Sequence, residues 1–366
     1  MIKYLKADNY RTFVNFKVDF SNINMLLGNN GVGKSTIFEL LYNLRSFIRG
    51  DKTVKDVFSF ESLTRWQNVP VQSFELGISY DNFDFVYMLE IEYNKDIKKN
   101  KVKRESVLCE GRTIFHAENG KATLYNDSYS EGPELLMNWL NSGVSAVYER
   151  SDNKKLCSFK TAINNIVVCH PSPVNVHDYC NTEEQYPDYR AENIVSVYLS
   201  VVQTNLESIA ALWEMLRQIN PAFCRTYLKG ETEKTLYFEY EHNGVKTKYK
   251  FSEISDGERM IFILYFLISV FSRDNYSLLL DEPDNYISLQ EVVQLIQHLQ
   301  DTEADNGQCV VISHHPKIID YFAIPSYGIW ITRRSYGATV ITEPPVATDY
   351  LTYSEIIASG DGFAAE

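Results

Sequence analysis

The residues best suited to chemistry fall in three short segments that lie far apart in the chain. The first runs from Gly28 to Thr36 and reads Gly-Asn-Asn-Gly-Val-Gly-Lys-Ser-Thr. The second runs from Ile254 to Glu258 and reads Ile-Ser-Asp-Gly-Glu. The third comprises Asp281-Glu282 after one apolar run and Ser313-His314-His315 after another. Glycines, a lysine, carboxylates and a histidine in this order indicate binding of phosphate and a divalent cation.

The first segment satisfies the G-x-x-x-x-G-K-[ST] pattern of a phosphate-binding loop. Residues 23–27 read as a buried strand before the loop and residues 35–44 as a helix after it. The glycines allow backbone amides to face a phosphate, and the helix N-terminus favours negative charge. We therefore expect Lys34 to neutralise the phosphates of ATP and Ser35 to hold Mg²⁺. The remaining nucleotide-binding residues of this loop are expected to be Asn29, Asn30, Gly31, Val32, Gly33 and Thr36.

The acidic pair follows residues 277–280, which are apolar enough for a central parallel strand. Asp281 at the strand end is expected to be the second Mg²⁺ ligand, and Glu282 to orient and deprotonate the attacking water. Residues 309–313 read as another buried strand, after which His314 is expected to reach the γ-phosphate. Alone, the acidic pair reads equally as a solvated strand end, and His314 as a structural histidine. The expected catalytic residues are Glu282, His314 and Lys34.

The second segment precedes a predicted helix over 260–271 and resembles the signature motif of ABC-type ATPases. The resemblance implies that Ser255, Asp256, Gly257 and Glu258 contact the ATP that is bound to another subunit. It therefore implies a homodimer, or a higher homo-oligomer, held together through ATP. The simpler alternative makes Ser255 only the N-cap of the helix. The order of the motifs, phosphate loop, signature, Asp-Glu strand and histidine, is the order used by that superfamily.

The spacing between motifs separates the classes of that superfamily. Lys34 and Ser255 lie 221 residues apart (255 − 34), much farther than in a transporter domain, so a transporter is not expected. Residues 4–13 look like the first strand of RecF-type and structural-maintenance-of-chromosomes (SMC) heads. Residues 281–287 and 313–316 are similar to those of stand-alone bacterial RecF-like ATPases. That group includes the OLD-type proteins and the PtuA-like ATPases of Septu and retron anti-phage systems.

Two departures from these families shape the expected function. OLD proteins continue into a Toprim nuclease domain, whereas only residues 317–366 follow Pro316 here, so we expect any nuclease to be a separate chain. The segment between the motifs lacks a sustained heptad repeat, so long-armed DNA tethering is not expected. The leading hypothesis is an ATPase subunit that controls a separately encoded effector in anti-phage defence. The alternatives are a RecF-like repair ATPase that binds DNA directly and a structural scaffold with slow turnover.

Hydrophobic patterning predicts the remaining elements. Residues 72–93 alternate as two antiparallel strands around Asp81-Asn82, and residues 102–125 continue in this style around Asn119-Gly120. Residues 236–251 read as a hairpin around Asn243-Gly244. Helical spacing appears over 132–148 and 191–219.

These patterns predict an α/β fold: an ABC-type P-loop head with a central, mostly parallel sheet, an antiparallel β-subdomain and a helical insert. The expected segments are a first ATPase lobe over 1–125, the helical insert over 126–231, a second lobe over 232–345 and a tail over 346–366.

From the bulk composition we expect a cytoplasmic enzyme that does not bind a membrane. The chain has 366 residues, six cysteines without a pairing framework, and no apolar run of membrane-spanning length. Its net charge of −13 gives no overall attraction for nucleic acid. DNA, the alternative partner, would therefore need a local basic patch.

Three smaller features allow two interpretations each. Lys95, Lys98, Lys99, Lys101, Lys103 and Arg104 form a basic cluster that could meet DNA phosphates or an acidic partner, or simply be a solvated hairpin tip. Cys169-His170 with His177-x-x-Cys180 could supply half a zinc site, or a loop with core cysteines. Arg11 could touch nucleotide or DNA, or form a salt bridge at the start of the fold.

Overall fold

The computed structural model describes residues 1–94, 96–273, 275–304, 307–322, 327–334, 337–344 and 351–359. The chain forms two compact units: Met1–Ile166 with Ala323–Glu366, and Val167–Phe322. The first unit therefore includes part of the segment predicted as a helical insert. The reason is that the chain up to residue 166 packs on the large sheet and on the first long helix of that unit.

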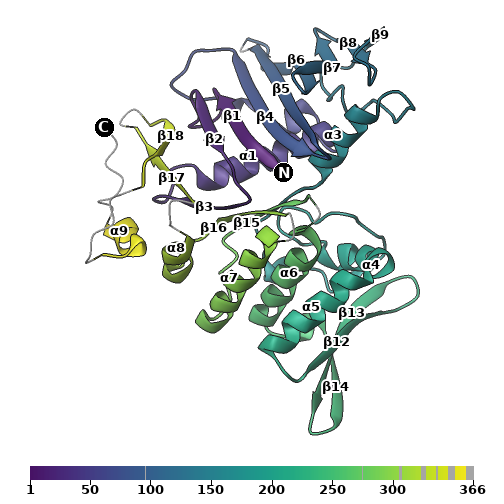
Figure 1. The fold of residues 1–366 in the computed structure, drawn as a ribbon, viewed down its shortest axis with the longest axis vertical. Coiled ribbons are helices and arrows are strands. Elements are labelled where there is room, and N and C mark those ends of the chain that lie inside the picture. Colours follow the sequence, from purple (N-terminus) through teal and green to yellow (C-terminus); the bar gives the residue numbers. More distant parts are fainter. Residues whose placement is uncertain are drawn as a thin grey trace. The chain divides into compact units, whose positions relative to one another are not determined.

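The largest sheet of the first unit is antiparallel throughout, with the order β2-β1-β4-β5-β6-β7-β8-β9 (Figure 1). Asp81, Asn82 and Asn119 adopt positive φ angles at the two predicted hairpin turns, which confirms those turns. The strands are β1 (Ile2–Asp8), β2 (Phe16–Asp19), β4 (Val71–Tyr80), β5 (Phe83–Asn94), β6 (Lys99–Cys109), β7 (Arg112–Glu118), β8 (Lys121–Tyr125) and β9 (Glu131–Leu136).

The first unit also holds the strand and helix that frame the phosphate loop. β3 (Ile23–Leu27) is buried along its whole length and pairs in parallel with β17 (Gly328–Arg333). β17 pairs in antiparallel fashion with β18 (Thr339–Thr342). The helices are α1 (Lys34–Arg49), α2 (Val54–Val57), α3 (Lys154–Asn164) and α9 (Tyr353–Ser359), and residues Phe60–Ser62 form a 3₁₀ turn. The predicted strand, loop and helix are thus confirmed.

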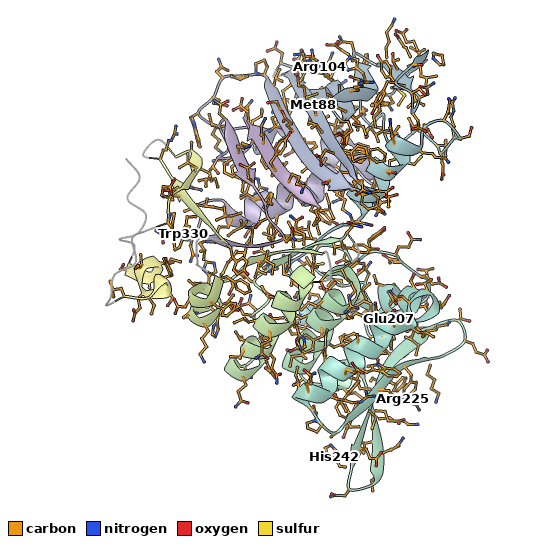
Figure 2. All side chains as sticks on the ribbon, in the orientation of Figure 1. Met88, Arg104, Glu207, Arg225, His242 and Trp330 are labelled. Carbon is orange, nitrogen blue, oxygen red and sulfur yellow. The ribbon has the colours of Figure 1, made fainter. Side chains whose placement is uncertain are left out.

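α9 packs against β17 through two aromatic rings. The ring of Tyr353 lies 5.5 Å from the ring of Trp330, a fully buried residue of β17 that is labelled in Figure 2. This contact ties the end of the described chain to the strand beside β3.

The helix predicted over 132–148 is wrong. Residues 131–136 form β9 at one end of the large sheet, and loop follows. Backbone pairing with the sheet continues beyond β9, since Met137 N donates to Gly120 O and Val102 N donates to Trp139 O. The apolar residues of this segment do not share one buried face, because Leu135 and Leu136 are exposed at 43% and 86% whereas Val144 and Val147 are buried. Pairing with the sheet determines the structure instead.

The second unit contains three neighbouring sheet strands in the order β10-β15-β16. β10 (Ile166–Cys169), β15 (Ser277–Asp281) and β16 (Gln308–Ile312) are buried. β15 and β16 are parallel, with Asp281 opposite Ile312, which confirms the two strands predicted before the acidic pair and His314. Helices α6 (Asp256–Phe271), α7 (Leu289–Ala304) and α8 (Pro316–Phe322) complete this part.

The helix predicted over 191–219 is two helices, α4 (Ile194–Thr204) and α5 (Leu206–Ile219), bent by 120°. Asn205 breaks it by capping α5, because its side chain accepts a hydrogen bond from Ser208 N. Within the described residues, no single helix is long and apolar enough to cross a membrane. Of the described helices, only α4 and α5 taken together, as a bent pair, have that length and apolarity.

A separate small sheet in this unit joins four strands, β11 (Tyr179–Cys180), β12 (Phe223–Lys229), β13 (Lys234–His242) and β14 (Val245–Lys250). Asn243 and Gly244 turn the hairpin of β13 and β14 with positive φ angles, as predicted. One face of the sheet packs on α6, where the rings of Phe238 and Phe262 lie 5.2 Å apart. The hairpin projects beyond the helices of its unit (Figure 1).

Candidate functional site

The phosphate loop has a backbone that only glycine permits at its two ends. Gly28, Gly31 and Gly33 have φ angles of 150°, 76° and 113°. A Cβ on Gly28 would lie 2.2 Å from the carbonyl oxygen of Ile331, and one on Gly33 would lie 2.9 Å from Thr339 Oγ1. The loop is therefore pressed against β17 and the start of β18, and it leads directly into α1.

Lys34 lies across this loop. Its side chain is buried, and its Nζ donates to Gly28 O at 2.6 Å and to Asn29 O at 3.0 Å. Asn30, Gly31 and Ser35 are exposed. A cation and a helix N-terminus thus meet at an open loop, which is an arrangement suited to a phosphate group.

Thr339 supports the loop from β18. Its side chain is fully buried, and Oγ1 donates to Val32 O at 2.7 Å. It also shares a hydrogen bond of 2.7 Å with Thr12 Oγ1, while Thr339 N donates to Thr12 O at 2.9 Å. The residues after β1 and the start of β18 therefore hold the loop from the side opposite its mouth. Sequence reasoning missed Thr339, because a threonine on a short strand carries no local signal.

Arg11 forms a salt bridge, which is the structural interpretation that the sequence allows for it. Its guanidinium pairs with the carboxylate of Glu39 on α1 and lies 5.8 Å from the centre of the Tyr10 ring. Arg11 and Thr12 also line a pocket of about 470 Å³, together with Glu39, Asn43, Asp56, Ser59, Arg65 and Trp66. Thr12 also bonds to Thr339, which supports the phosphate loop, and the volume of the pocket is within the range of small-molecule sites.

Asp281 is the buried carboxylate at the end of β15. Its side chain is 2% exposed. Oδ2 lies 3.6 Å from His170 Nδ1 and accepts from the Tyr189 hydroxyl at 3.5 Å. The rings of His170 and Tyr189 are stacked with their centres 6.2 Å apart. The hydrogen bond with Asp281 raises the pKa of His170.

The other oxygen of Asp281 fits a divalent cation. Oδ1 is buried, and none of the described residues donates a hydrogen bond to it. A buried, charged oxygen without a donor is costly, and a bound Mg²⁺ would satisfy it, since Mg²⁺ prefers carboxylate oxygen. Ser35, the other predicted ligand, is exposed in the first turn of α1.

Glu282 and His314 lie close together after adjacent parallel strands. Glu282 has a φ angle of 51°, and its N donates to Ile312 O at 2.8 Å. Asn285 Nδ2 donates to its Oε2 at 3.0 Å, and His314 Nε2 lies 3.9 Å from its Oε1. Both side chains are partly exposed. A left-handed backbone at a non-glycine residue is a strained feature often found at functional sites, and here it belongs to the predicted general base.

The signature segment begins α6 with a capping box. Ser255 Oγ accepts from Glu258 N at 3.3 Å, and Glu258 Oε2 accepts from Ser255 N at 3.1 Å. Ser255 is therefore the N-cap of α6, as the simpler interpretation predicted. Ser255 and Asp256 are nevertheless exposed at the N-terminus of a 16-residue helix, so the cap remains accessible to an anion. A Cβ on Gly257 would approach Tyr286 O to 3.1 Å.

His170 is a candidate zinc ligand by its sequence, but its side chain faces Asp281 in the structure. Among the residues that the structure describes, no group of three or more His, Cys, Asp or Glu side chains could hold a metal ion. Cys169 and Cys180 are buried in β10 and β11, which favours the alternative of a loop with core cysteines. A signal for His170 was present in the sequence, because it follows a buried strand just as Glu282 and His314 do.

Three cations of the basic cluster around β6 are paired with carboxylates. Lys101 Nζ lies 3.1 Å from Glu92, and Lys103 Nζ lies 3.1 Å from Glu90. Arg104, labelled in Figure 2, contacts Glu90 at 3.4 Å and Glu118 at 3.3 Å. Lys95 lies outside the described residues. These pairs favour the interpretation as a solvated hairpin.

The predicted residues thus fall into two local groups. Residues 28–36 form the phosphate loop in the first unit. The signature residues 255–258, Asp281, Glu282 and His314 belong to the second unit. Within the second unit the structure brings Glu282 and His314 together, and it adds His170 and Tyr189 to Asp281.

Comparison with known proteins identifies the fold. Residues 4–172 match a family model described as an AAA domain. The chain is similar to the SMC head bound to the C-winged helix domain of ScpA, with a TM-score of 0.59 and 13% identity over 93% of this chain and 97% of that chain. It is also similar to the SMC head domain with an extended coiled coil bound to the C-terminal domain of ScpA derived from Pyrococcus furiosus. That similarity has a TM-score of 0.55 and 11% identity over 98% of each chain.

A comparison with curated proteins gave no match. The similarity to two SMC heads over nearly their whole length confirms the predicted α/β fold of an ABC-type ATPase head.

Proposed function

We propose that this chain binds ATP with Mg²⁺ and hydrolyses it in a dimer closed around the nucleotide. The observation that carries the proposal is the phosphate loop, with glycines at positive φ and a buried lysine lying across it at the start of α1. The orphaned Oδ1 of Asp281 and the neighbouring Glu282 and His314 support it, because they offer a metal ligand and a base.

The residues predicted from the sequence would make the nucleotide site. Lys34 would exchange its bonds to Gly28 O and Asn29 O for the β- and γ-phosphates, which the amides of residues 29–36 would cradle. Ser35 and Asp281 would hold Mg²⁺, which when bound supplies charge neutralisation at the phosphate oxygens. The pocket beside Thr12 and Trp66 would accept the nucleoside.

Glu282 would act as the general base. The attacking water would form a bond to the γ-phosphorus and pass a proton to Glu282, while the bond from that phosphorus to the β–γ bridging oxygen breaks. The products are ADP and inorganic phosphate. His314, 3.9 Å from Glu282, would contact the γ-phosphate, and Asn285 would fix the carboxylate through its bond to Oε2.

Residues 255–258 of a second copy would close the site. The exposed N-terminus of α6 would meet the γ-phosphate and add the partial positive charge of a long helix. ATP would then bind the closed dimer better than the open form, and hydrolysis would remove that link. ATP binding would thereby close the dimer, and hydrolysis would allow it to open.

The test is ATP hydrolysis by the full chain, with binding measured separately. Lys34→Ala should lose ATP binding, and Glu282→Gln should keep binding but lose turnover. Glu183→Gln, at an exposed position, is the matched control and should behave as wild type. Wild-type turnover in Glu282→Gln would overturn the role given to Glu282.

We infer further that the dimer controls a separately encoded effector, such as a nuclease, in anti-phage defence in the cytoplasm. The support is the resemblance of residues 281–287 and 313–316 to the stand-alone bacterial RecF-like ATPases, a group that includes the PtuA-like ATPases. The two similar SMC heads were each solved with a domain of a separate protein, ScpA. Co-purification of a small effector encoded beside this chain would support the inference. DNA-stimulated hydrolysis by the chain alone would instead support a repair ATPase. Stable ATP-bound oligomers with very slow turnover would support a scaffold.

A further inference from the structure

The outer face of the small sheet in the second unit collects cations and aromatic rings. Strand register places Arg225 beside Glu239, Tyr227 beside Tyr237, and Glu239 beside Lys248. Because alternate residues of a strand share a face, this face carries Arg225, Tyr227 and Lys229 of β12, Tyr237, Glu239 and Glu241 of β13, and Lys246, Lys248 and Lys250 of β14. The opposite face is the one that packs on α6. Arg225 and His242 are labelled in Figure 2, on β12 and at the hairpin end.

Positive charge exceeds negative charge on this face. The side chain of Glu239 is 3% exposed, and three cations surround it: Arg225 at 3.4 Å, Lys246 at 3.2 Å and Lys248 at 3.9 Å. Each of these cations is more than half exposed. One carboxylate cannot neutralise three cations, and Glu241 is the only further carboxylate that the register places on this face.

The ion-paired cations on β6 are matched more closely by carboxylates. Lys101 pairs with Glu92, while Lys103 and Arg104 share Glu90 and Glu118. The whole chain has a net charge of −13. The positive outer face of β12–β14 is therefore a local departure from the average of the molecule, and it favours a polyanion.

Aromatic rings lie between these cations. The rings of Tyr227 and Tyr237 are stacked with centres 5.6 Å apart and planes inclined by 13°, and both residues are half-buried. The Arg225 guanidinium lies 5.4 Å and the Lys248 ammonium 5.8 Å from the centre of the Tyr227 ring. Lys246, Lys248 and Lys250 form a row about 14 Å long, because alternate residues of a strand are about 7 Å apart.

We propose that the outer face of β12–β14 binds single-stranded nucleic acid, with phosphates along the lysine row and bases against the tyrosines. An acidic peptide would satisfy the charge but offers no flat groups for the rings. A duplex would satisfy the charge but keeps its base faces stacked inside. Single strands present both phosphates and open base faces, which is the combination that cationic, aromatic surfaces bind. The proposal does not depend on the ATP site.

The test uses a fluorescein-labelled oligothymidylate of about 20 nucleotides and the full chain, with binding followed by anisotropy over a salt series. Lys246→Ser/Lys248→Ser should weaken binding by about 10–30-fold at about 0.1 M salt and make the log–log salt slope shallower by about 1.4. Tyr227→Leu should weaken binding about fivefold or more. Lys101→Ser/Lys103→Ser removes the same charge from β6 and should leave affinity unchanged.

Three results would overturn the proposal. The first is no binding of the oligothymidylate by wild type at about 50 mM salt. The second is equal weakening by the two double-lysine variants, which would show that only bulk charge matters. The third is that a duplex or poly-glutamate binds as tightly as the oligothymidylate, and that Tyr227→Leu does not change this binding. Lys34→Ala, tested without nucleotide, should bind the oligothymidylate as wild type does, so this proposal and the ATPase proposal fail separately.

Discussion

Replacing Asp281 with Asn should change stability in opposite directions with and without nucleotide. Asp281 is 2% exposed, and its buried Oδ1 receives no hydrogen bond from the described residues. If Oδ1 is a metal ligand, the protein without metal is destabilised, because the charged oxygen is then buried without a partner. A neutral amide of the same shape lowers that cost, and it also removes the metal ligand.

The size of both effects can be estimated. An unsatisfied buried acceptor costs about 1–3 kcal/mol, while the lost contact with the partly exposed His170 at 3.6 Å is worth about 0–1 kcal/mol. The nucleotide-free variant should thus gain about 1–2 kcal/mol, or roughly 1–3 °C in the unfolding temperature of a 366-residue chain. A ligand at about 100 times its Kd stabilises wild type by about 2.7 kcal/mol, and the variant should lack most of this gain.

The assay is thermal unfolding of the full chain in EDTA and with Mg²⁺ and a non-hydrolysable ATP analogue. The variant should be the more stable protein in EDTA, and wild type the more stable with nucleotide. Asp96→Asn, at an exposed position, is the control and should shift neither curve. A variant that is less stable than wild type in EDTA, or that gains as much from nucleotide, would refute the reasoning.

Three further substitutions test other parts of the site. Lys34→Ala should reduce ATP affinity at least tenfold in a calorimetric titration, because the buried lysine is the cation of the loop; unchanged affinity would exclude it as a phosphate ligand. Thr339→Val should lower the free energy of unfolding by about 1–3 kcal/mol, since Val32 O loses its donor; Thr342→Val on the same strand should cost much less, and equal losses would dismiss the loop support. His170→Ala should weaken Mn²⁺ binding in the nucleotide complex about 10–100-fold, as measured by electron paramagnetic resonance. ATP affinity in EDTA should be unchanged, and a loss of that affinity would indicate a general structural role.

Local signals predicted the elements that carry the expected chemistry. The glycine pattern before Lys34 requires a strand, loop and helix, and the structure has β3, the loop and α1 there. The apolar runs before Asp281 and His314 predicted β15 and β16, because buried parallel strands are apolar on both faces. Turn residues with positive φ placed the hairpins, since few residue types tolerate that conformation.

Contacts between distant segments could not be predicted. Thr339 reaches Val32 across more than three hundred residues, and a single threonine has no pattern that reveals this. Tyr189 reaches Asp281 from a loop. The false helix over 132–148 has the same cause, because its backbone pairs with Val102 and Gly120. Apolar spacing alone did not show that a sheet edge was available.

The central claim is that ATP links two copies of this chain and that Glu282 ends the link by hydrolysis. The most direct test is mass in solution by light scattering, without nucleotide and with ATP and Mg²⁺, for wild type and Glu282→Gln, with phosphate release followed in the same samples. The account predicts a mass that doubles with ATP, persists in the variant and is accompanied there by lost turnover. A mass that does not respond to nucleotide in either protein, with phosphate release unchanged by the substitution, would contradict it.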